Sequence, residues 1–174
     1  LVLFLFITMN KNHGVHHVRN NLNSFDVEST PYDGAIEFEL NTDDILAGRK
    51  QPEKITSIYQ TDIYLAEIYE KINSINEDEE VHIVIGFESK FKSPEGKMVS
   101  LHEIWPDGRT NSGLVNVEAF NQGGDPGVFG AGSGDHEGRF EQAVSYFFTK
   151  EEINKSYKWR FSISDFFILH YKEK

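Results

Sequence analysis

Cysteine is absent from the 174-residue chain, so the protein has no disulfide, no thiolate nucleophile and no cysteine-ligated zinc site. Basic residues are scarce as well, because 17 Lys and Arg stand against 28 Asp and Glu and give a formal net charge of −11. A surface of this charge repels the phosphates of nucleic acids and anionic lipid head groups. The composition therefore argues against a general nucleic-acid-binding protein.

Long hydrophobic runs are also missing. The most apolar stretch is residues 1–9, which is far shorter than the roughly 20 residues of a membrane-spanning helix. No transmembrane span is predicted. Three interpretations of this stretch stay open: a buried N-terminal strand, a mis-set start before Met9, or the end of a secretory signal, which would place the protein outside the cytoplasm or at a cell surface.

What is present suits one compact domain, since 39% of the residues are hydrophobic and 13% are aromatic. Residues 10–31 are rich in Asn, His and Ser, which is typical of an irregular segment. We therefore expect residues 1–30 to form an apolar run and a polar arm. A single β-rich globular domain is expected over residues 31–174.

Most of the predicted secondary structure is strand. Apolar and acidic residues alternate over residues 36–40, and residues 81–87 are rich in valine and isoleucine. Turn sequences with proline and glycine predict that residues 81–120 form three antiparallel strands in succession. Residues 158–171 are predicted to form a final pair of strands.

The best helical pattern lies at residues 62–75. Apolar residues recur there at spacings of three and four, which predicts one stripe of a helix: Leu65, Ile68, Tyr69, Ile72 and Ile75. Single helical turns are predicted at residues 42–47, before a glycine, and at residues 149–152, which resemble a capping box. Residues 140–148 fit either a helix or a strand, and their β-forming side chains favour the strand.

These elements predict a β-rich α+β fold. About seven or eight mostly antiparallel strands would form a sandwich or a strongly curved sheet, with the helix near residues 62–75 packed on one face. A closed, calycin-like β-barrel is the second architecture.

The glycine-rich stretch at residues 121–139 is predicted to be a long loop, of a length that is often functional. Its glycine spacing does not match a phosphate-binding fingerprint. Asp135, His136 and Glu137 are the candidate catalytic residues. The same three residues and Asp125 are the candidate ligands of a divalent cation such as Ca²⁺, although the EF-hand spacing is missing. No other cofactor is predicted.

Aromatic residues offer a different kind of site. Trp105 comes directly before a Pro-Asp-Gly turn, where core packing explains it poorly. Together with Tyr64 and Asp125 it forms the candidate ligand-binding set, because exposed rings stack on sugars and anchor protein partners. Residues 31–80 hold 13 acidic and four basic residues, and this acidic segment is either a face for a basic partner or a solvated surface.

The sequence favours a non-catalytic binding or assembly module over an enzyme, because no convergent catalytic set is visible. Such a module would engage a protein partner or a larger complex through edge strands, loops and the acidic segment. One alternative is a hydrolase or metal-dependent enzyme that uses the glycine-rich loop. The other is a carbohydrate or small-ligand binder that uses the exposed aromatic residues. Fold class alone does not decide between these functions.

Overall fold

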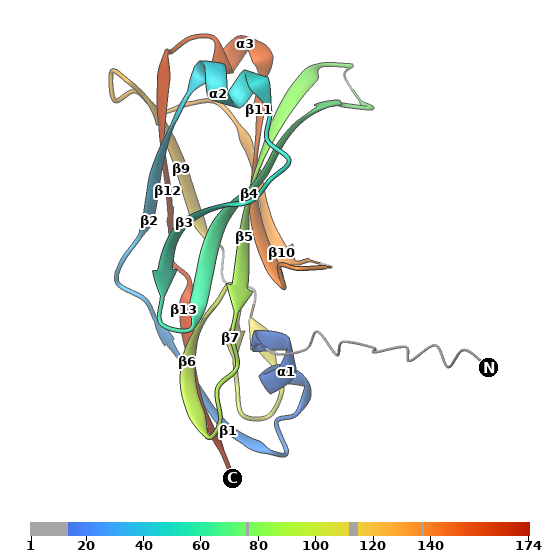
Figure 1. Ribbon diagram of the computed structural model, residues 1–174, viewed down its shortest axis with the longest axis vertical. Coiled ribbons are helices and arrows are strands. Elements are labelled where there is room, and N and C mark those ends of the chain that lie inside the picture. Colours follow the sequence, from blue (N-terminus) through green and yellow to red (C-terminus); the bar gives the residue numbers. More distant parts are fainter. Residues whose placement is uncertain (1–13, 76, 112–114, 137) are drawn as a thin grey trace, which may run out of the picture.

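The computed structural model describes residues 14–75, 77–111, 115–136 and 138–174. These residues form thirteen strands and three short helices. The strands pair antiparallel in four separate sheets. The molecule is elongated, and most strands run along its long axis (Figure 1).

Two of the sheets pack face to face as a sandwich in the upper half of the molecule (Figure 1). The larger one, here named the central sheet, has the strand order β10-β11-β5-β4-β3. Its strands are β3 (Glu53–Ile58), β4 (Thr61–Ile72), β5 (Glu79–Ser89), β10 (Gly130–Asp135) and β11 (Gln142–Thr149). The other one, the facing sheet, has the order β2-β12-β9. Its strands are β2 (Ile36–Asn41), β9 (Asn116–Asn121) and β12 (Lys158–Ser164).

One large hydrophobic core fills the space between the central and facing sheets. The central sheet contributes side chains such as Ile85 and Phe148, and the facing sheet contributes Trp159 and Phe161, all at most 1% exposed. The indole of Trp159 donates a hydrogen bond to the carbonyl of Ile153 at 3.1 Å, so its polar atom is satisfied inside the core.

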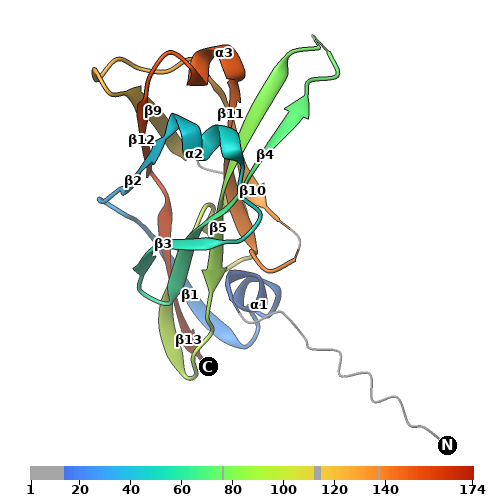
Figure 2. The same cartoon turned by 45° about the horizontal axis from the view of Figure 1, so that its top comes forward.

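A third sheet, the lower sheet, continues the fold below the sandwich and has the order β1-β13-β6. Its strands are β1 (Phe25–Pro31), β6 (Glu95–Ser100) and β13 (Phe167–Glu173). Asp165, with a φ of 60°, lies between β12 and β13 and redirects the chain from the facing sheet into the lower sheet. Helix α1 (Val15–Asn20) packs on one face of the lower sheet, where Val15 and Val18 join a second core with Phe25 and Met98 (Figure 2).

Two further helices, α2 (Thr42–Ala47) and α3 (Lys150–Ile153), lie at the upper end of the sandwich (Figure 1). Gly48 ends α2 with a φ of 71°, as the sequence predicts. Thr149 caps α3, because its hydroxyl accepts a hydrogen bond from the backbone N–H of Glu152 at 3.2 Å. None of the helices in the described ranges has the length and hydrophobicity that a membrane crossing requires.

The predicted fold class, a strand-rich α+β sandwich of antiparallel sheets, is confirmed. The alternative of a closed calycin-like barrel is wrong, because each sheet formed by the described residues has two end strands. The strands outnumber the predicted seven or eight, because β1, β3, β4, β8 (Thr110–Asn111) and β10 form where no strand was predicted. The strand predicted at residues 140–148 is confirmed as β11.

The helix predicted at residues 62–75 is wrong, because this segment forms β4. The ladder between β4 and β5 shifts by one residue between Leu65 and Glu67. Ala66 is therefore the extra residue of a β-bulge, and the buried residues Leu65 and Ile68 are three positions apart although both belong to a strand. The bulge thus accounts for the helix-like spacing of Leu65 and Ile68.

Strand pairing also differs from the prediction. Residues 81–120 do not form one antiparallel succession, because β5 belongs to the central sheet, β6 to the lower sheet and β9 to the facing sheet. Likewise, β12 and β13 pair with strands of different sheets instead of with each other. The predicted Pro106-Asp107-Gly108 turn does form, but it joins β7 (Glu103–Ile104) to β8 and not to the strand predicted near residues 113–120. Residues 15–31, expected to be part of an irregular arm, contain α1 and β1. The apolar run at residues 1–9 lies outside the described residues.

Candidate functional site

Strand β10 forms a free edge of the central sheet. It stands at the end of the strand order and pairs with β11, whereas its other side has no strand partner among the residues that the structure describes. Five of its six residues are exposed, and Gly134 is half-buried. Residues 130–135 were predicted to belong to a loop, and they instead offer a row of backbone groups to solvent at the side of the sandwich (Figure 1).

The outer face of this edge has no side chains of its own. Gly130, Gly132 and Gly134 alternate along β10, so all three lie on the face that points away from the facing sheet. Phe147 of β11 pairs with Gly130. A Cβ atom on Gly130 would lie 3.3 Å from the ring of Phe147, and one on Gly132 would lie 3.6 Å from it. The ring therefore rests against the bare backbone of the edge strand.

Phe147 is the last ring of an aromatic row across the outer face of the central sheet. Its centroid is 4.6 Å from that of the His82 imidazole, which in turn stacks on Tyr69 at 5.0 Å. His82 is only 7% exposed and forms a hydrogen bond with Glu80 at 3.1 Å. The row runs from β4 across β5 to β11 and ends over the glycines of β10.

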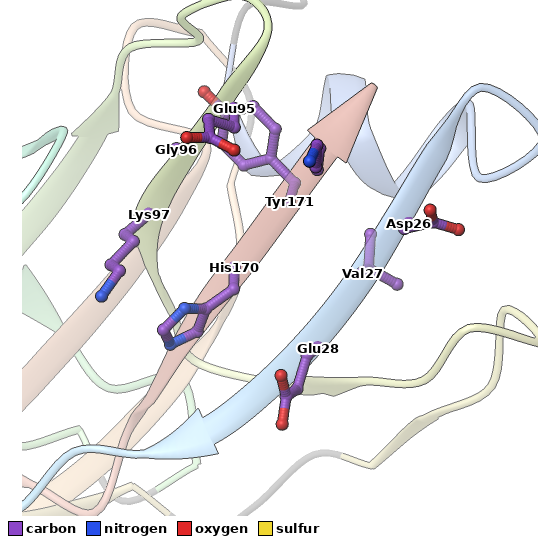
Figure 3. A pocket seen from close by; sticks show the side chains of 9 residues that line it. Asp26, Val27, Glu28, Glu95, Gly96, Lys97, His170 and Tyr171 are labelled. Atoms are coloured by element: carbon purple, nitrogen blue, oxygen red, sulfur yellow. The ribbon is translucent and has the colours of Figure 1, made fainter. Parts of the chain in front are cut away.

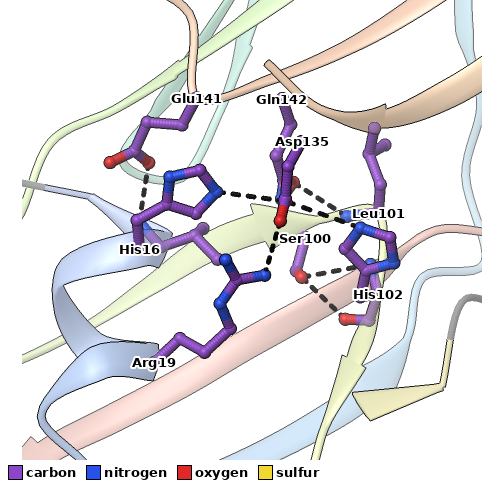
Figure 4. A network of polar contacts seen from close by, with 9 residues as sticks. His16, Arg19, Ser100, Leu101, His102, Asp135, Glu141 and Gln142 are labelled. Atoms are coloured by element: carbon purple, nitrogen blue, oxygen red, sulfur yellow. Dashed lines mark hydrogen bonds and ion pairs between the residues drawn. The ribbon is translucent and has the colours of Figure 1, made fainter. Parts of the chain in front are cut away.

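A polar network lies at the end of β10, around Asp135 (Figure 4). Arg19 donates a hydrogen bond to Oδ2 of Asp135 at 2.9 Å, and Nε2 of His16 lies 3.0 Å from Oδ1. Nε2 of His102 lies 3.6 Å from the same oxygen. Burial raises the pKa of Asp135, but the hydrogen bonds and charges of His16 and Arg19 lower it to below its ordinary value. The network thus ties α1 and the β6–β7 turn to the end of the edge strand.

Two neighbouring residues complete this network. A carboxylate oxygen of Glu141 accepts a hydrogen bond from the backbone N–H of Val15 at 2.8 Å, at the start of α1. Burial raises the pKa of Glu141 despite this bond. Gln142 accepts a hydrogen bond from the backbone N–H of Leu101 at 2.9 Å, while its buried Nε2 has no partner among the described atoms. The arrangement positions segments of the chain, and the carboxylate of Asp135 is already engaged by cationic and imidazole groups.

The candidate catalytic and metal-ligating residues do not gather at one place. Asp135 belongs to the network above, and the backbone of His136 donates to the carbonyl of Glu141 at 2.8 Å. Asp125 instead closes the turn after β9, where its carboxylate accepts a hydrogen bond from Asn121 at 3.1 Å. Glu137 lies outside the described residues. Within the described ranges, no group of three or more His, Asp or Glu side chains is arranged to hold a metal ion.

The candidate aromatic residues also lie apart. Trp105 is half-buried at the β7–β8 turn, where its indole donates to Glu103 at 2.9 Å and Arg109 lies 5.0 Å from its ring centroid. Tyr64 lies on β4, where Arg139 lies 4.6 Å from its ring centroid. Each ring thus has its own cation, and the two do not form a shared platform.

A hollow of about 600 Å³ lies on the exposed face of the lower sheet (Figure 3). Glu28, His170 and Lys97 form a row across its three strands. A second row places Asp26 and Glu95 on either side of Lys172. Acidic and basic groups alternate in this hollow and offset one another, as on an ordinary solvated sheet face.

The acidic segment at residues 31–80 is divided between two sheets, because β2 belongs to the facing sheet and β3 and β4 to the central sheet. Its end forms the β4–β5 hairpin, which projects beyond the body of the sandwich (Figures 1 and 2). Ile72 and Ile75, counted as part of a helix stripe in the sequence, are 65% and 93% exposed on this hairpin. Lys150 holds the base of the hairpin through ion pairs with Glu70 at 2.8 Å and Glu79 at 3.0 Å.

Sequence reasoning missed the features that distinguish this site. His16, Arg19 and His102 lie more than 30 residues from Asp135 in the chain, so no local motif could group them. The edge strand did leave a signal: glycine recurs at every second residue over 130–134, and a period of two is typical of a strand.

Comparison of the chain with protein families, curated proteins and solved structures finds no significant match.

Proposed function

We propose that this protein is a non-catalytic protein-binding module that holds an extended segment of a partner along the free edge of β10. In this mode of recognition a peptide adds a strand to an exposed sheet edge, and main-chain hydrogen bonds supply much of the affinity. The position of β10 at the end of the central sheet and its exposure support the proposal.

The observation that carries the proposal is a difference between the two edges of the same sheet. Proteins protect edge strands with charged residues, proline or β-bulges, because an unprotected edge pairs with other chains. The β3 edge has such protection: Pro52 precedes it, Arg49 pairs with Glu53 at 2.8 Å, and the ladder is irregular between Lys54 and Thr56.

The β10 edge lacks this protection. Residues 130–134 are Gly-Ala-Gly-Ser-Gly, without a charge or a proline, and the β10–β11 ladder runs without a register shift. The one charged residue of the strand is Asp135 at its end, and that carboxylate is held by Arg19 and His16. The central sheet thus has one protected edge, at β3, and one unprotected edge, at β10. This difference supports a role for β10 in pairing with another chain.

The alternatives have less support. The general base of a hydrolase is most effective with a pKa near the operating pH, and the hydrogen bonds and charges of His16 and Arg19 hold the pKa of Asp135 below its ordinary value. A sugar platform would need open ring faces, and Arg109 lies over Trp105 as Arg139 lies over Tyr64.

The test is to protect the edge by substitution. Ala131→Lys combined with Ser133→Lys adds two charges on exposed positions of β10, and Gln51→Lys combined with Gln122→Lys adds the same charge on exposed positions outside it. The probes are labelled seven-residue peptides in which Val, Ile or Phe alternates with Thr or Lys, and matched peptides with proline at the three consecutive central positions, which removes backbone donors from both edges of the peptide.

We expect the alternating peptides to bind the wild type and the control variant, as measured by fluorescence anisotropy. The β10 variant should bind them at least about tenfold more weakly, which corresponds to about 1.4 kcal/mol. Proline peptides should not bind, because they lack the backbone donors that a ladder needs. Equal binding of the peptides to the wild type and the β10 variant, or no binding to either, would contradict the proposal.

A further inference from the structure

The glycines of β10 and the ring of Phe147 lie side by side at the free edge of the central sheet. Phe147 is half-buried and rests on Gly130 and Gly132 with no Cβ atom between the ring and the edge. On the side toward β5, the imidazole of His82 lies against the ring, with 4.6 Å between the two centroids. The opposite edge of the ring lies along the glycines of β10 and is directed toward the position of an added strand.

We infer that the partner segment places a large apolar side chain, aromatic or branched aliphatic, on the outer face opposite Gly132. This inference rests on the proposed strand addition. An added strand would lie about 4.8 Å from β10, and its side chain opposite a glycine meets no side chain on β10 itself. A large side chain can lean across that glycine and pack on Phe147, which is the way aromatic residues compensate for glycine in sheets.

Contact with the Phe147 ring is available along only one part of β10. A Cβ atom on Gly134 would have no heavy atom within 4 Å, whereas one on Gly132 would lie 3.6 Å from Phe147. A side chain opposite Gly134 therefore gains no ring contact, and selectivity for size is expected near Gly132 and Gly130 only.

Charge favours a different protein over a second copy of this chain as the source of the segment. The net charge of −11 makes two copies repel each other, and it favours a neutral or basic segment. The partner that fits is thus an extended stretch with large apolar residues on one face and few acidic residues.

The experiment compares two peptides with the same polar residues, one with Phe and the other with Ala on the apolar face. Binding is measured to the wild type, to Gly132→Thr and to Gly134→Thr. Threonine is a strand former, and neither glycine has a φ in the left-handed region, so both variants keep the strand. Threonine at position 132 fills the space beside Phe147, and threonine at position 134 serves as the matched control.

We expect the wild type to prefer the Phe peptide by at least about tenfold. This preference should fall to about threefold or less in Gly132→Thr and stay unchanged in Gly134→Thr. An equal preference in all three proteins, or none in the wild type, would overturn the inferred selectivity.

Strand addition itself would still stand if Ala131→Lys with Ser133→Lys abolished binding of both peptides. A dimer in light scattering that the same double variant dissociates, and that peptides do not displace, would identify a second copy as the occupant and overturn the inference.

Discussion

The side chain of Glu141 has two opposing effects on the free energy of unfolding. Its carboxylate accepts a backbone hydrogen bond at the start of α1, yet burial raises its pKa. Because the folded-state pKa lies above the unfolded value of about 4.3, the folded protein binds protons more tightly in that range. Stability contributed by the neutral form is therefore present below about pH 4 and is lost as the pH rises through the folded pKa.

Glu141→Gln removes this charge and keeps an oxygen that can accept the bond from Val15. We expect a higher free energy of unfolding than in the wild type at pH 7, and a difference that shrinks as the pH falls toward about 4. Urea denaturation at several pH values measures it. Glu151→Gln, on the exposed side of α3, is the control and should show no such trend. A destabilised Glu141→Gln at pH 7 would show that the charged bond to α1 outweighs burial.

Strand β4 is the element where sequence and structure disagree most, and the disagreement can be tested by stability. A helix stripe would bury Leu65, Ile68, Ile72 and Ile75 alike, whereas the bulged strand buries the first two and exposes the others. We expect Ile68→Ala to lower the free energy of unfolding by about 2–4 kcal/mol. Ile72→Ala should change it by less than about 0.5 kcal/mol, because that side chain is on the projecting hairpin. Similar losses for both variants would contradict the strand.

The elements that the sequence does predict are those whose signal is local. The alternation at residues 36–40, the Thr149 cap of α3 and the glycine after α2 each depend on a few neighbouring side chains, and each is found in the structure. Strand pairing depends on contacts between distant segments. Asp165, for example, redirects the chain between two sheets, and nothing in the adjacent residues shows which strands β12 and β13 will meet. The candidate site follows the same division, since the glycine alternation is local and the cations around Asp135 come from distant segments.

At the scale of the whole molecule, the two larger hydrophobic cores, one inside the sandwich and one between α1 and the lower sheet, are joined by covalent and polar links. The chain passes between the sandwich and the lower sheet at β1–β2, at β5–β6, between β6 and β9, and at β12–β13. The network of Asp135 adds a connection between α1, which covers the lower core, and β10, which belongs to the sandwich. The order of β10 is thereby linked to the docking of α1.

The connection between α1 and β10 through Asp135 predicts which segments the substitution Asp135→Asn will destabilise. The ion pairs hold the pKa of Asp135 below its ordinary value, so they contribute stability at neutral pH that is lost as the pH falls through that lowered value. Because the carboxylate is 42% exposed, solvent screening limits the contribution to about 0.5–1 kcal/mol. We expect hydrogen exchange at pH 7 to become about two- to fivefold faster in α1 and β10, and to stay unchanged in β5.

Asp107→Asn is the matched control, because that carboxylate is 53% exposed and pairs with Arg109 within the β7–β8 turn. It should leave exchange in α1 and β10 as in the wild type. Faster exchange throughout the central sheet in Asp135→Asn would mean that the network stabilises the whole fold instead of fastening one edge. Unchanged exchange in α1 would mean that Val15 and Val18, buried in the lower core, hold the helix without Asp135. The expected pattern, loosening confined to α1 and β10, would show that the N-terminal helix controls the order of the strand that we propose to bind partners.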